Sequence, residues 1–216
     1  MAYPDDAKRI ERRTGLAGAT VSAGQAEVLA AYLDVLRRWN QRGNLTAFEL
    51  NPPSDGALDR LIVEPIVAAK WLLPADRLLV DIGSGGGSPG IPLRIVSANL
   101  RVVLVEARAR KAAFLREAVR QLGLDRVEVE NRRFEELAGR SELRGAADVV
   151  TVRAVRTTRE FWLNTRNMLH SKGRAFFFGT ADDTSTISLP VNVRLTLDEP
   201  LVPANGSRLF IISRLD

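Results

Sequence analysis

The sequence of 216 residues contains no cysteine and only one histidine, His170. Without cysteine the protein forms no disulfide, no thiolate metal site and no cysteine nucleophile, which agrees with a cytosolic protein. His170 stands beside Lys172 and Gly173, where we expect a helix to end. A histidine at such a position interacts favourably with the helix dipole, so we predict a structural role for it, and we expect no metal site in the chain.

Long hydrophobic runs are also missing. The first residues, MAYPDDAKRIERR, carry charges of both signs and lack the apolar segment of a secretory signal. Charged residues such as Lys70 and Asp81 interrupt the longest apolar stretches, which are too short to cross a membrane. The composition, 45% hydrophobic and 26% charged, is typical of a soluble globular protein. We therefore expect a cytoplasmic protein with no membrane partner.

Positive charge is concentrated in one part of the chain. Residues 1–74 contain nine Lys or Arg and nine Asp or Glu, whereas residues 101–174 contain seventeen against ten. Nearly all of these cations are arginines, whose guanidinium groups bind phosphate in a bidentate manner. The excess indicates either a polyanionic partner such as nucleic acid or a solvated basic surface.

The hydrophobic pattern changes its period near residue 78. Before it, residues 24–41 and 56–73 have helical spacing, and Pro65 predicts a kink or break in the second helix. After it, strands alternate with helices, which indicates a parallel, doubly wound sheet with helices on both faces. We predict residues 1–74 as a helical extension and residues 75–216 as an α/β domain. The expected strands are 78–82, 101–106, 126–130, 147–152 and 173–178, with helices at 89–98, 108–123 and up to about His170, and with a terminal antiparallel hairpin.

The stretch DIGSGGGSPGIP, residues 81–92, follows the first predicted strand. In a doubly wound sheet ligands bind at this edge, so we interpret the glycines as a ligand-binding loop rather than a flexible turn. A dinucleotide fingerprint G-x-G-x-x-G that starts at Gly83 would need glycine where the chain has Ser88. The phosphate-binding pattern G-x-x-x-x-G-K-[ST] is absent as well.

The pattern Asp81-x-Gly83-x-Gly85-x-Gly87, with Glu106 at the end of the second strand, resembles the first motif of class I S-adenosylmethionine-dependent methyltransferases. Residues without a Cβ atom let the backbone pass close to the methionyl and ribose parts of that cofactor. Glu106 is suited to accept hydrogen bonds from both ribose hydroxyls. For Asp81 two roles stay open, a contact with the cofactor and a cap on the amides of the loop.

Further segments resemble, in the same order, the bacterial 16S rRNA guanine-N7 methyltransferases. This family is also called small-subunit methyltransferase G or glucose-inhibited division protein B. The segments are YLDVLRRWNQRGNLTAF (32–48), RKAAFLREAVRQLGL (110–124), RRFEEL (132–137) and DVVTVRAV (148–155). The resemblance covers residues 24–178, and W-N-x-x-x-N-L-T is its most specific part. There we expect Asn40 and Asn44 to brace the junction between helix and loop.

The resemblance implies a Rossmann-like class I methyltransferase fold and S-adenosylmethionine as cofactor. It implies 16S rRNA or the small ribosomal subunit as partner, for a protein that we expect to be a monomer. Phe134 would stack on the adenine. Arg153 matches the arginine of the family's S-R-A motif, which implies a functional role. The alternative for Arg153 is a structural role as a partner of Asp148 or of the loop. The expected cofactor-binding residues are Asp81, Gly83, Ser84, Gly85, Gly87, Ser88, Glu106, Ala107, Phe134, Glu135 and Arg153.

On the RNA side the resemblance implies Arg110, Lys111 and Arg208, of which Arg208 matches an arginine ahead of the last strand. Guanine N7 carries a lone pair and no proton, so methyl transfer to it needs no general base. Catalysis then rests on holding N7 in line with the bond between sulfur and methyl. We therefore expect Arg153 and Arg208 to position the reactants.

The chain departs from the family pattern at three places. Ser88 replaces a bulky residue, Leu61 and Pro65 replace a histidine and a serine, and Gly179 stands where the family has a lysine. Two alternatives follow from these departures. One is a class I methyltransferase that acts on a small molecule or a protein, and the other is a relative that binds RNA or the ribosome without catalysis.

Overall fold

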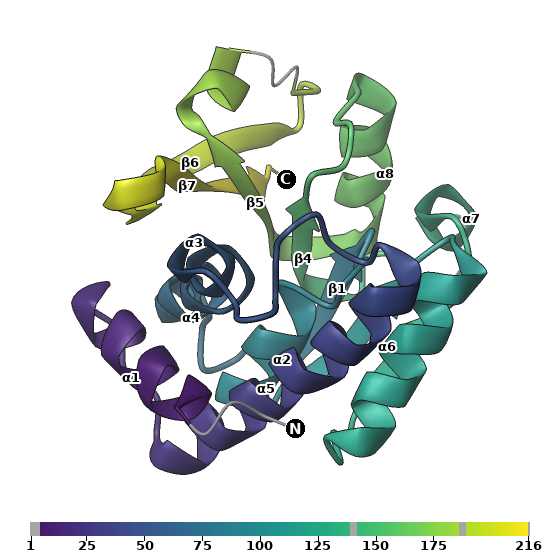
Figure 1. Ribbon diagram of the computed structural model, residues 1–216. Coiled ribbons are helices and arrows are strands. Elements are labelled where there is room, and N and C mark those ends of the chain that lie inside the picture. Colours follow the sequence, from purple (N-terminus) through teal and green to yellow (C-terminus); the bar gives the residue numbers. More distant parts are fainter. Residues whose placement is uncertain (1–4, 139–141, 186–188, 216) are drawn as a thin grey trace.

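A seven-stranded sheet organises the structure, in the order β3-β2-β1-β4-β5-β7-β6 (Figure 1). The computed structural model describes residues 5–138, 142–185 and 189–215. The first five strands in this order are parallel, while β7 is antiparallel to both β5 and β6. This confirms the predicted α/β sheet and its C-terminal hairpin. The strands are β1 (Leu78–Ile82), β2 (Arg101–Val105), β3 (Val127–Glu130), β4 (Ala147–Arg153), β5 (Leu169–Thr180), β6 (Val193–Val202) and β7 (Ser207–Arg214).

Strand β1 lies between β2 and β4, and all five of its residues are buried. The order of the strands along the chain therefore reverses between β1 and β4. Parallel sheets bind ligands at such a reversal, beyond the carboxyl ends of the strands. The glycine loop leaves β1 at this edge of the sheet.

Helices cover both faces of the sheet and form two cores (Figure 1). Leu79 and Leu104 point to one face, where they pack with apolar side chains of α2, α5 and α6. Val80 and Val103 point to the other face, which α7 and α8 cover. Alternation along each strand produces this division, because successive side chains of a strand lie on opposite faces.

The helices differ in length and regularity. They are α1 (Asp6–Leu16), α2 (Ala23–Gly43), α3 (Asp55–Leu58), α4 (Glu64–Ala68), α5 (Gly90–Val96), α6 (Ala109–Gln121), α7 (Phe134–Ala138) and α8 (Arg159–Met168), with a π-helix η1 (Asp59–Val63) and 3-10 turns η2 (Ala69–Trp71), η3 (Ala181–Ser185) and η4 (Pro203–Asn205). No helix in the described ranges is long and apolar enough to cross a bilayer.

The predicted break near Pro65 takes the form of a π-helix. Residues Asp59–Val63 form wider turns than an α-helix, and Pro65 then lies in the first turn of α4. Proline lacks the backbone N–H of a normal helical turn, and its ring would clash with the carbonyl four residues earlier. A wider turn in front of it relieves this conflict, and in a first turn the missing N–H costs little.

The prediction for the region of His170 was wrong. Helix α8 ends at Met168, and His170 belongs to β5, which begins at Leu169 opposite Ala147 of β4. Its Nε2 lies 2.8 Å from a carboxylate oxygen of Asp148, and its Nδ1 accepts the backbone N–H of Lys172 at 2.9 Å. The ring therefore has a structural role, as expected, but within a strand and far along β4 from the glycine loop. Helices α1 and α7 were not predicted.

A buried ion pair attaches α1 to α2. Arg37 of α2 donates to the carboxylate of Asp6 at 2.8 Å and to the carbonyl of Leu50 at 2.8 Å. Both side chains are almost completely buried. A second pair of charges, Arg13 with Asp59, joins α1 to the π-helix through hydrogen bonds of 2.6 and 2.7 Å.

We expect Arg37→Met to destabilise the protein by about 3–5 kcal/mol, because it leaves the buried Asp6 with only the more distant Arg9, at 3.8 Å, as a counter-charge. Urea unfolding monitored by circular dichroism measures this change. Arg38→Ala is the control. It removes the same charge from the next position of α2, where the side chain is half exposed and pairs with Asp34, and it should cost less than about 1 kcal/mol. Equal effects of the two substitutions would contradict a special role for the buried pair.

Candidate active site

The loop after β1 has a backbone path that only glycine follows easily. Gly83 and Gly87 have φ values of +69° and +91°. A Cβ atom on Gly83 would lie 2.7 Å from Cγ2 of Val155, and one on Gly87 would lie 2.6 Å from Cδ1 of Ile91. Both positions therefore require glycine on two counts, the left-handed backbone and the close neighbour.

Glu106 follows the end of β2 and ties the loop to that strand. Its carboxylate accepts the backbone N–H of Gly85 at 3.0 Å and that of Arg108 at 2.8 Å, one on each oxygen. A carboxylate oxygen accepts two hydrogen bonds, so within the described part of the chain each oxygen keeps one acceptor site free. The side chain also lines a pocket, where these acceptor sites are suited to two neighbouring hydroxyl groups.

This pocket brings together residues at or just beyond the carboxyl ends of the four parallel strands β1, β2, β3 and β4. It has a volume of about 230 Å³, and a second pocket of about 340 Å³ adjoins it and shares Phe134, Glu135 and Val155. The ring of Phe134 is tilted against Phe161 with 4.9 Å between centroids, and it remains partly exposed for stacking. The lining residues of the first pocket are Ile82, Gly83, Val105, Glu106, Ala107, Arg132, Arg133, Phe134, Glu135 and Val155.

These features fit S-adenosylmethionine. Glycine backbone, a carboxylate with free acceptor sites and a partly exposed aromatic ring meet at one pocket, as the methionyl, ribose and adenine parts of the cofactor require. The structure thus brings five of the sequence-predicted residues together, namely Gly83, Glu106, Ala107, Phe134 and Glu135.

Asp81 and Ser84 lie beneath the loop and do not line this pocket. Asp81 accepts a hydrogen bond from the hydroxyl of Thr151 at 2.6 Å, and the hydroxyl of Ser84 donates to the carbonyl of Asp81 at 2.9 Å. Burial raises the pKa of Asp81 from 3.8 to about 6, although hydrogen bonds from Thr151 and Ser84 act in the opposite direction. Within the described residues its second oxygen makes no hydrogen bond of normal geometry, and it lies against Gly90 at the start of α5.

The sequence did not predict that side chains of α2 contact the glycine loop. The hydroxyl of Tyr32 donates to the carbonyl of Gly86 at 2.6 Å, and burial raises the pKa of this phenol. Leu36 and the carbonyl of Leu45 also lie against Gly86. The turn that follows α2 is braced as predicted, because the side chain of Asn40 accepts the backbone N–H of Thr46 at 3.0 Å.

Arg153, at the end of β4, lies on the other side of the loop within a buried polar cluster. Its guanidinium donates to Glu64 at 2.9 Å, to the hydroxyl of Ser88 at 3.3 Å and to the carbonyl of Arg60. It also lies over the ring of Phe178, 4.5 Å from its centroid. Burial lowers the pKa of Arg153 to about 10, while Glu64 acts against this shift, so the group stays charged at neutral pH.

Glu64 holds this cluster together and was not among the predicted site residues. It is completely buried, pairs with Arg60 at 3.1 Å as well as with Arg153, and accepts a hydrogen bond from Asn205 at 3.1 Å. Asp148, the partner that the sequence left open for Arg153, instead binds His170. The residue after Arg153, Ala154, has a φ of +53°, which is uncommon for a non-glycine residue.

The three residues predicted to contact RNA lie at two separate places. Arg110 and Lys111 are in the first turn of α6. Nε of Arg110 lies 3.2 Å from the Cβ position of Gly43, and Nζ of Lys111 lies 3.8 Å from that of Gly85. Arg208 is on β7, opposite Gly179 of β5, and pairs with Asp198 at 2.5 Å.

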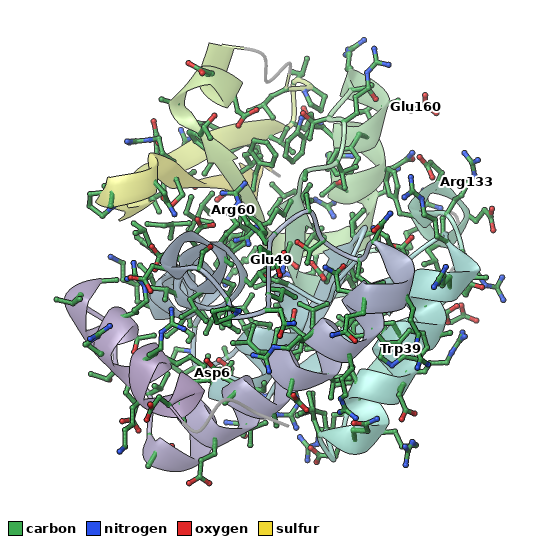
Figure 2. The ribbon with its side chains drawn as sticks, viewed as in Figure 1. Asp6, Trp39, Glu49, Arg60, Arg133 and Glu160 are labelled. Carbon is green, nitrogen blue, oxygen red and sulfur yellow. The ribbon has the colours of Figure 1, made fainter. Side chains whose placement is uncertain are left out.

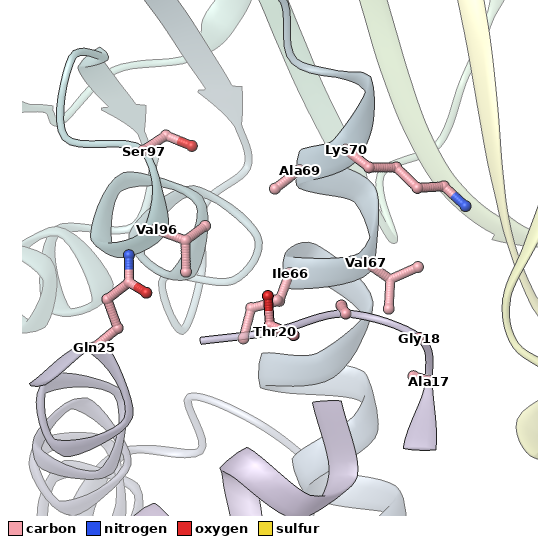
Figure 3. A pocket seen from close by; sticks show the side chains of 11 residues that line it. Ala17, Gly18, Thr20, Gln25, Ile66, Val67, Ala69, Lys70, Val96 and Ser97 are labelled. Atoms are coloured by element: carbon pink, nitrogen blue, oxygen red, sulfur yellow. The ribbon is translucent and has the colours of Figure 1, made fainter. Parts of the chain in front are cut away.

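A larger cavity of about 390 Å³ lies away from the glycine loop (Figure 3). It is enclosed by the connection between α1 and α2, by α4 and η2, and by the end of α5. Lys70 is its one charged lining residue, and Figure 3 shows this side chain extending away from Gln25 and Ser97. Because no ionisable groups converge there, we place the active site at the smaller pocket beside Glu106.

Comparisons with known proteins agree with this assignment. The family model of rRNA small subunit methyltransferase G matches residues 25–188. The chain belongs to this family. It is 37% identical over 172 residues to the ribosomal RNA small subunit methyltransferase G of Neisseria gonorrhoeae, which covers 77% of each chain. It is 42% identical over 147 residues to the protein of that name from Stenotrophomonas maltophilia, over 66% of this chain and 63% of the relative.

Solved structures support the fold independently. A putative O-methyltransferase from Klebsiella pneumoniae superposes with a TM-score of 0.59 at 16% identity, over 86% of this chain and 90% of the other. The predicted class I methyltransferase fold is thus confirmed. As a member of the family, the protein is a methyltransferase that uses S-adenosylmethionine.

We expect Gly83→Ala to weaken S-adenosylmethionine binding by at least tenfold, because the new Cβ meets Val155 at the pocket. Calorimetric titration measures the affinity. Gly123→Ala is the matched control, since Gly123 has a similar φ of +60° but open space around its Cβ position and lies beyond α6. Gly123→Ala should lose about 1 kcal/mol of stability and Gly83→Ala more, because of its additional contact with Val155, and only Gly83→Ala should lose affinity. Unchanged binding in Gly83→Ala would contradict the proposed path of the loop beside the cofactor.

The raised pKa of Asp81 predicts an unusual dependence of the protein's stability on pH. Because its pKa is higher in the folded protein, near 6, than the ordinary 3.8, the native state keeps a proton that the unfolded chain releases. The contribution of this group to stability therefore falls as the pH rises between about 4 and 6, in total by about 3 kcal/mol.

Asp81→Asn removes this loss, so the variant should gain about 3 kcal/mol relative to the parent between pH 4 and pH 7, as measured by urea unfolding at each pH. Asp148→Asn is the control of opposite sign. Burial raises the pKa of Asp148, but hydrogen bonds from the backbone of Leu78 and Arg77 and from His170 together outweigh burial. The net pKa therefore lies below the ordinary 3.8. A pH-independent difference between parent and Asp81→Asn would show that Asp81 is not shifted.

Proposed function

We propose that the protein transfers the methyl group of S-adenosylmethionine to N7 of a guanine in 16S rRNA, in the cytoplasm and as a monomer. The observation that carries the proposal is the pocket in which Gly83, Glu106 and Phe134 meet, in a chain of the rRNA small subunit methyltransferase G family. The relatives named above are ribosomal RNA small subunit methyltransferases, which supports the same acceptor here.

Each part of the pocket has a separate task. Glu106 accepts hydrogen bonds from the ribose hydroxyls with the acceptor sites that Gly85 and Arg108 leave free. Phe134 stacks on the adenine, and the backbone at Gly83 passes beside the methionyl part. The bound cofactor supplies an electrophilic methyl group on its sulfonium sulfur.

The ionisable groups around the loop suit an acceptor that carries no proton. Asp81 is bonded to Thr151, Glu106 to two amides and Glu64 to Arg153, so these three carboxylates already have a structural task. Guanine N7 attacks with its lone pair and needs no general base. The protein then contributes chiefly by holding base and methyl group in line. Arg153, whose guanidinium touches Ser88 of the loop, and Arg208 are the proposed positioning residues.

One feature favours the non-catalytic alternative. At Gly179, where the family has a lysine, the carboxylate of Asp183 lies 2.6 Å from the Cβ position and accepts the backbone N–H of Thr180 at 2.7 Å. The negative charge of Asp183 thus lies close to Gly179, the position at which the family has a positively charged lysine. Gly179 is paired with Arg208 on the neighbouring strand β7. This arrangement weakens attraction to a phosphate on that side of the sheet.

Transfer of labelled methyl groups tests the function directly. Purified protein and S-adenosylmethionine are incubated with small ribosomal subunits and with free 16S rRNA from cells that lack this methyltransferase. We expect label in the RNA as 7-methylguanosine, detected by mass spectrometry after digestion. Label in a small molecule or a protein would show a different acceptor, and RNA binding without any transfer would support the non-catalytic alternative.

Glu106→Ala provides the internal check. The loss of charge-assisted hydrogen bonds to the ribose should lower transfer at limiting cofactor by about ten- to a hundredfold. Glu128→Ala, on the neighbouring strand β3, removes the same charge from an exposed pair with Arg101 and should leave transfer unchanged.

A further inference from the structure

A basic groove lies between α2 and α6, next to the glycine loop but outside the cofactor pocket. It has a volume of about 370 Å³, and it is lined by Arg38, Trp39, Gln41, Arg42 and Arg110. Figure 2 labels Trp39 where α2 runs alongside α6. Two elements far apart in the sequence thus contribute to one surface, of which only Arg110 was predicted to contact RNA.

All charged groups that line the groove are cations. Arg42 and Arg110 are exposed, and neither forms an ion pair or side-chain hydrogen bond within the described ranges. Arg38 is partly neutralised by Asp34 at 3.3 Å, and it donates to Gln121 at 2.8 Å. Glu117, further along α6, is already paired with Arg120 at 2.7 Å. The groove therefore presents at least two free guanidinium groups and no free carboxylate.

For Arg38 and Arg42 this excess does not follow from composition, because residues 1–74 carry equal numbers of both charges. Arg110 lies against Gly43, the last residue of α2, where a cation is favourable for the helix dipole alone. Yet it donates to no carbonyl of that helix in the described part of the chain, so its donors remain free for a ligand. Planar guanidinium groups with free donors match the geometry of phosphate oxygens.

Trp39 gives the groove a partly apolar floor. Its indole packs edge-to-face on Phe114 of α6, with 5.9 Å between centroids, and Phe114 is completely buried. The ring is held in place yet remains partly exposed, and its N–H makes no hydrogen bond within the described residues. Aromatic surface beside cations is the usual combination in sites for single-stranded nucleic acid.

The groove lies close to the glycine loop of the active site. Arg110 touches the end of α2, and the next residue, Lys111, brings its Nζ to 3.8 Å from the Cβ position of Gly85 in the loop. A nucleotide chain whose target base lies at the loop therefore has its neighbouring phosphates within reach of this surface.

We propose that the groove between α2 and α6 binds a single-stranded segment of the substrate RNA beside the target guanine. Arg42 and Arg110 bind phosphates, and the exposed part of Trp39 contacts a base or ribose. This assignment rests on the proposed function and adds to it a surface on the N-terminal helices.

The experiment measures binding of 16S rRNA transcribed in vitro to the full chain by fluorescence anisotropy over a series of salt concentrations. Arg42→Ala and Arg110→Ala should each weaken binding about fivefold at 0.1 M salt, and each should lower the slope of log K against log salt by about 0.7. Trp39→Leu should weaken binding with an unchanged slope. The affinity for S-adenosylmethionine should stay within twofold in all three variants.

Arg101→Ala is the matched control, because Arg101 is an exposed arginine at the opposite end of β2 from Glu106. It removes the same charge and should leave RNA binding unchanged apart from a small general effect. If the control weakens binding as much as Arg42→Ala, attraction is non-specific and the groove is not a site. If the parent methylates RNA while the groove variants bind and methylate it normally, the groove proposal is overturned and the function stands.

Further outcomes also overturn the proposal. If the groove variants bind free RNA normally but lose transfer to assembled subunits, the groove contacts a ribosomal protein. If the parent binds neither free RNA nor small ribosomal subunits, both this proposal and the proposed function fail, and if it binds and methylates subunits but binds no free RNA, only this proposal fails.

Discussion

The backbone path of residues 83–87 is the constraint on which the site depends. The loop must turn back at the end of β1 so that its backbone lies beside the pocket, and Gly83, Gly85 and Gly87 adopt positive φ values to do so. Flexible residues alone would not hold this shape, because glycine loses more conformational entropy on folding than any other residue. Bonds from two sides hold it instead, Glu106 to the amide of Gly85 and Tyr32 to the carbonyl of Gly86.

These bonds connect the N-terminal helices to the cofactor site. Tyr32 belongs to α2, and Arg37 on the same helix is anchored by buried bonds to Asp6 and Leu50. On the opposite side Glu64 holds Arg153, which in turn reaches Ser88 of the loop. The boundary between two domains at residue 74 therefore stays a prediction. In the structure, apolar side chains from both sides of residue 74 pack in one hydrophobic core.

Features that depend on local pattern were predictable from the sequence. The strands around β1 are apolar runs bounded by turns, and their order places Glu106 and Phe134 at one edge of the sheet. Features that depend on contacts between residues far apart in the sequence could not be predicted from it. Leu169 pairs with Ala147 and so starts β5 where helical spacing predicted more helix. Tyr32 and Glu64 act on residues 54 and 89 positions away, and neither local period nor motif marks such contacts.

The distribution of charge follows from the reaction that we propose. Methyl transfer to a neutral base carries positive charge from sulfur to the base, so an unpaired cation beside the acceptor would oppose it. Arg153, the arginine that touches the loop, is paired with Glu64 in the buried cluster, and it shares this carboxylate with Arg60. The free guanidinium groups of Arg42 and Arg110 instead lie across the loop, in the groove between α2 and α6. There they can attract phosphates from outside the pocket in which the positive charge passes from sulfur to the base.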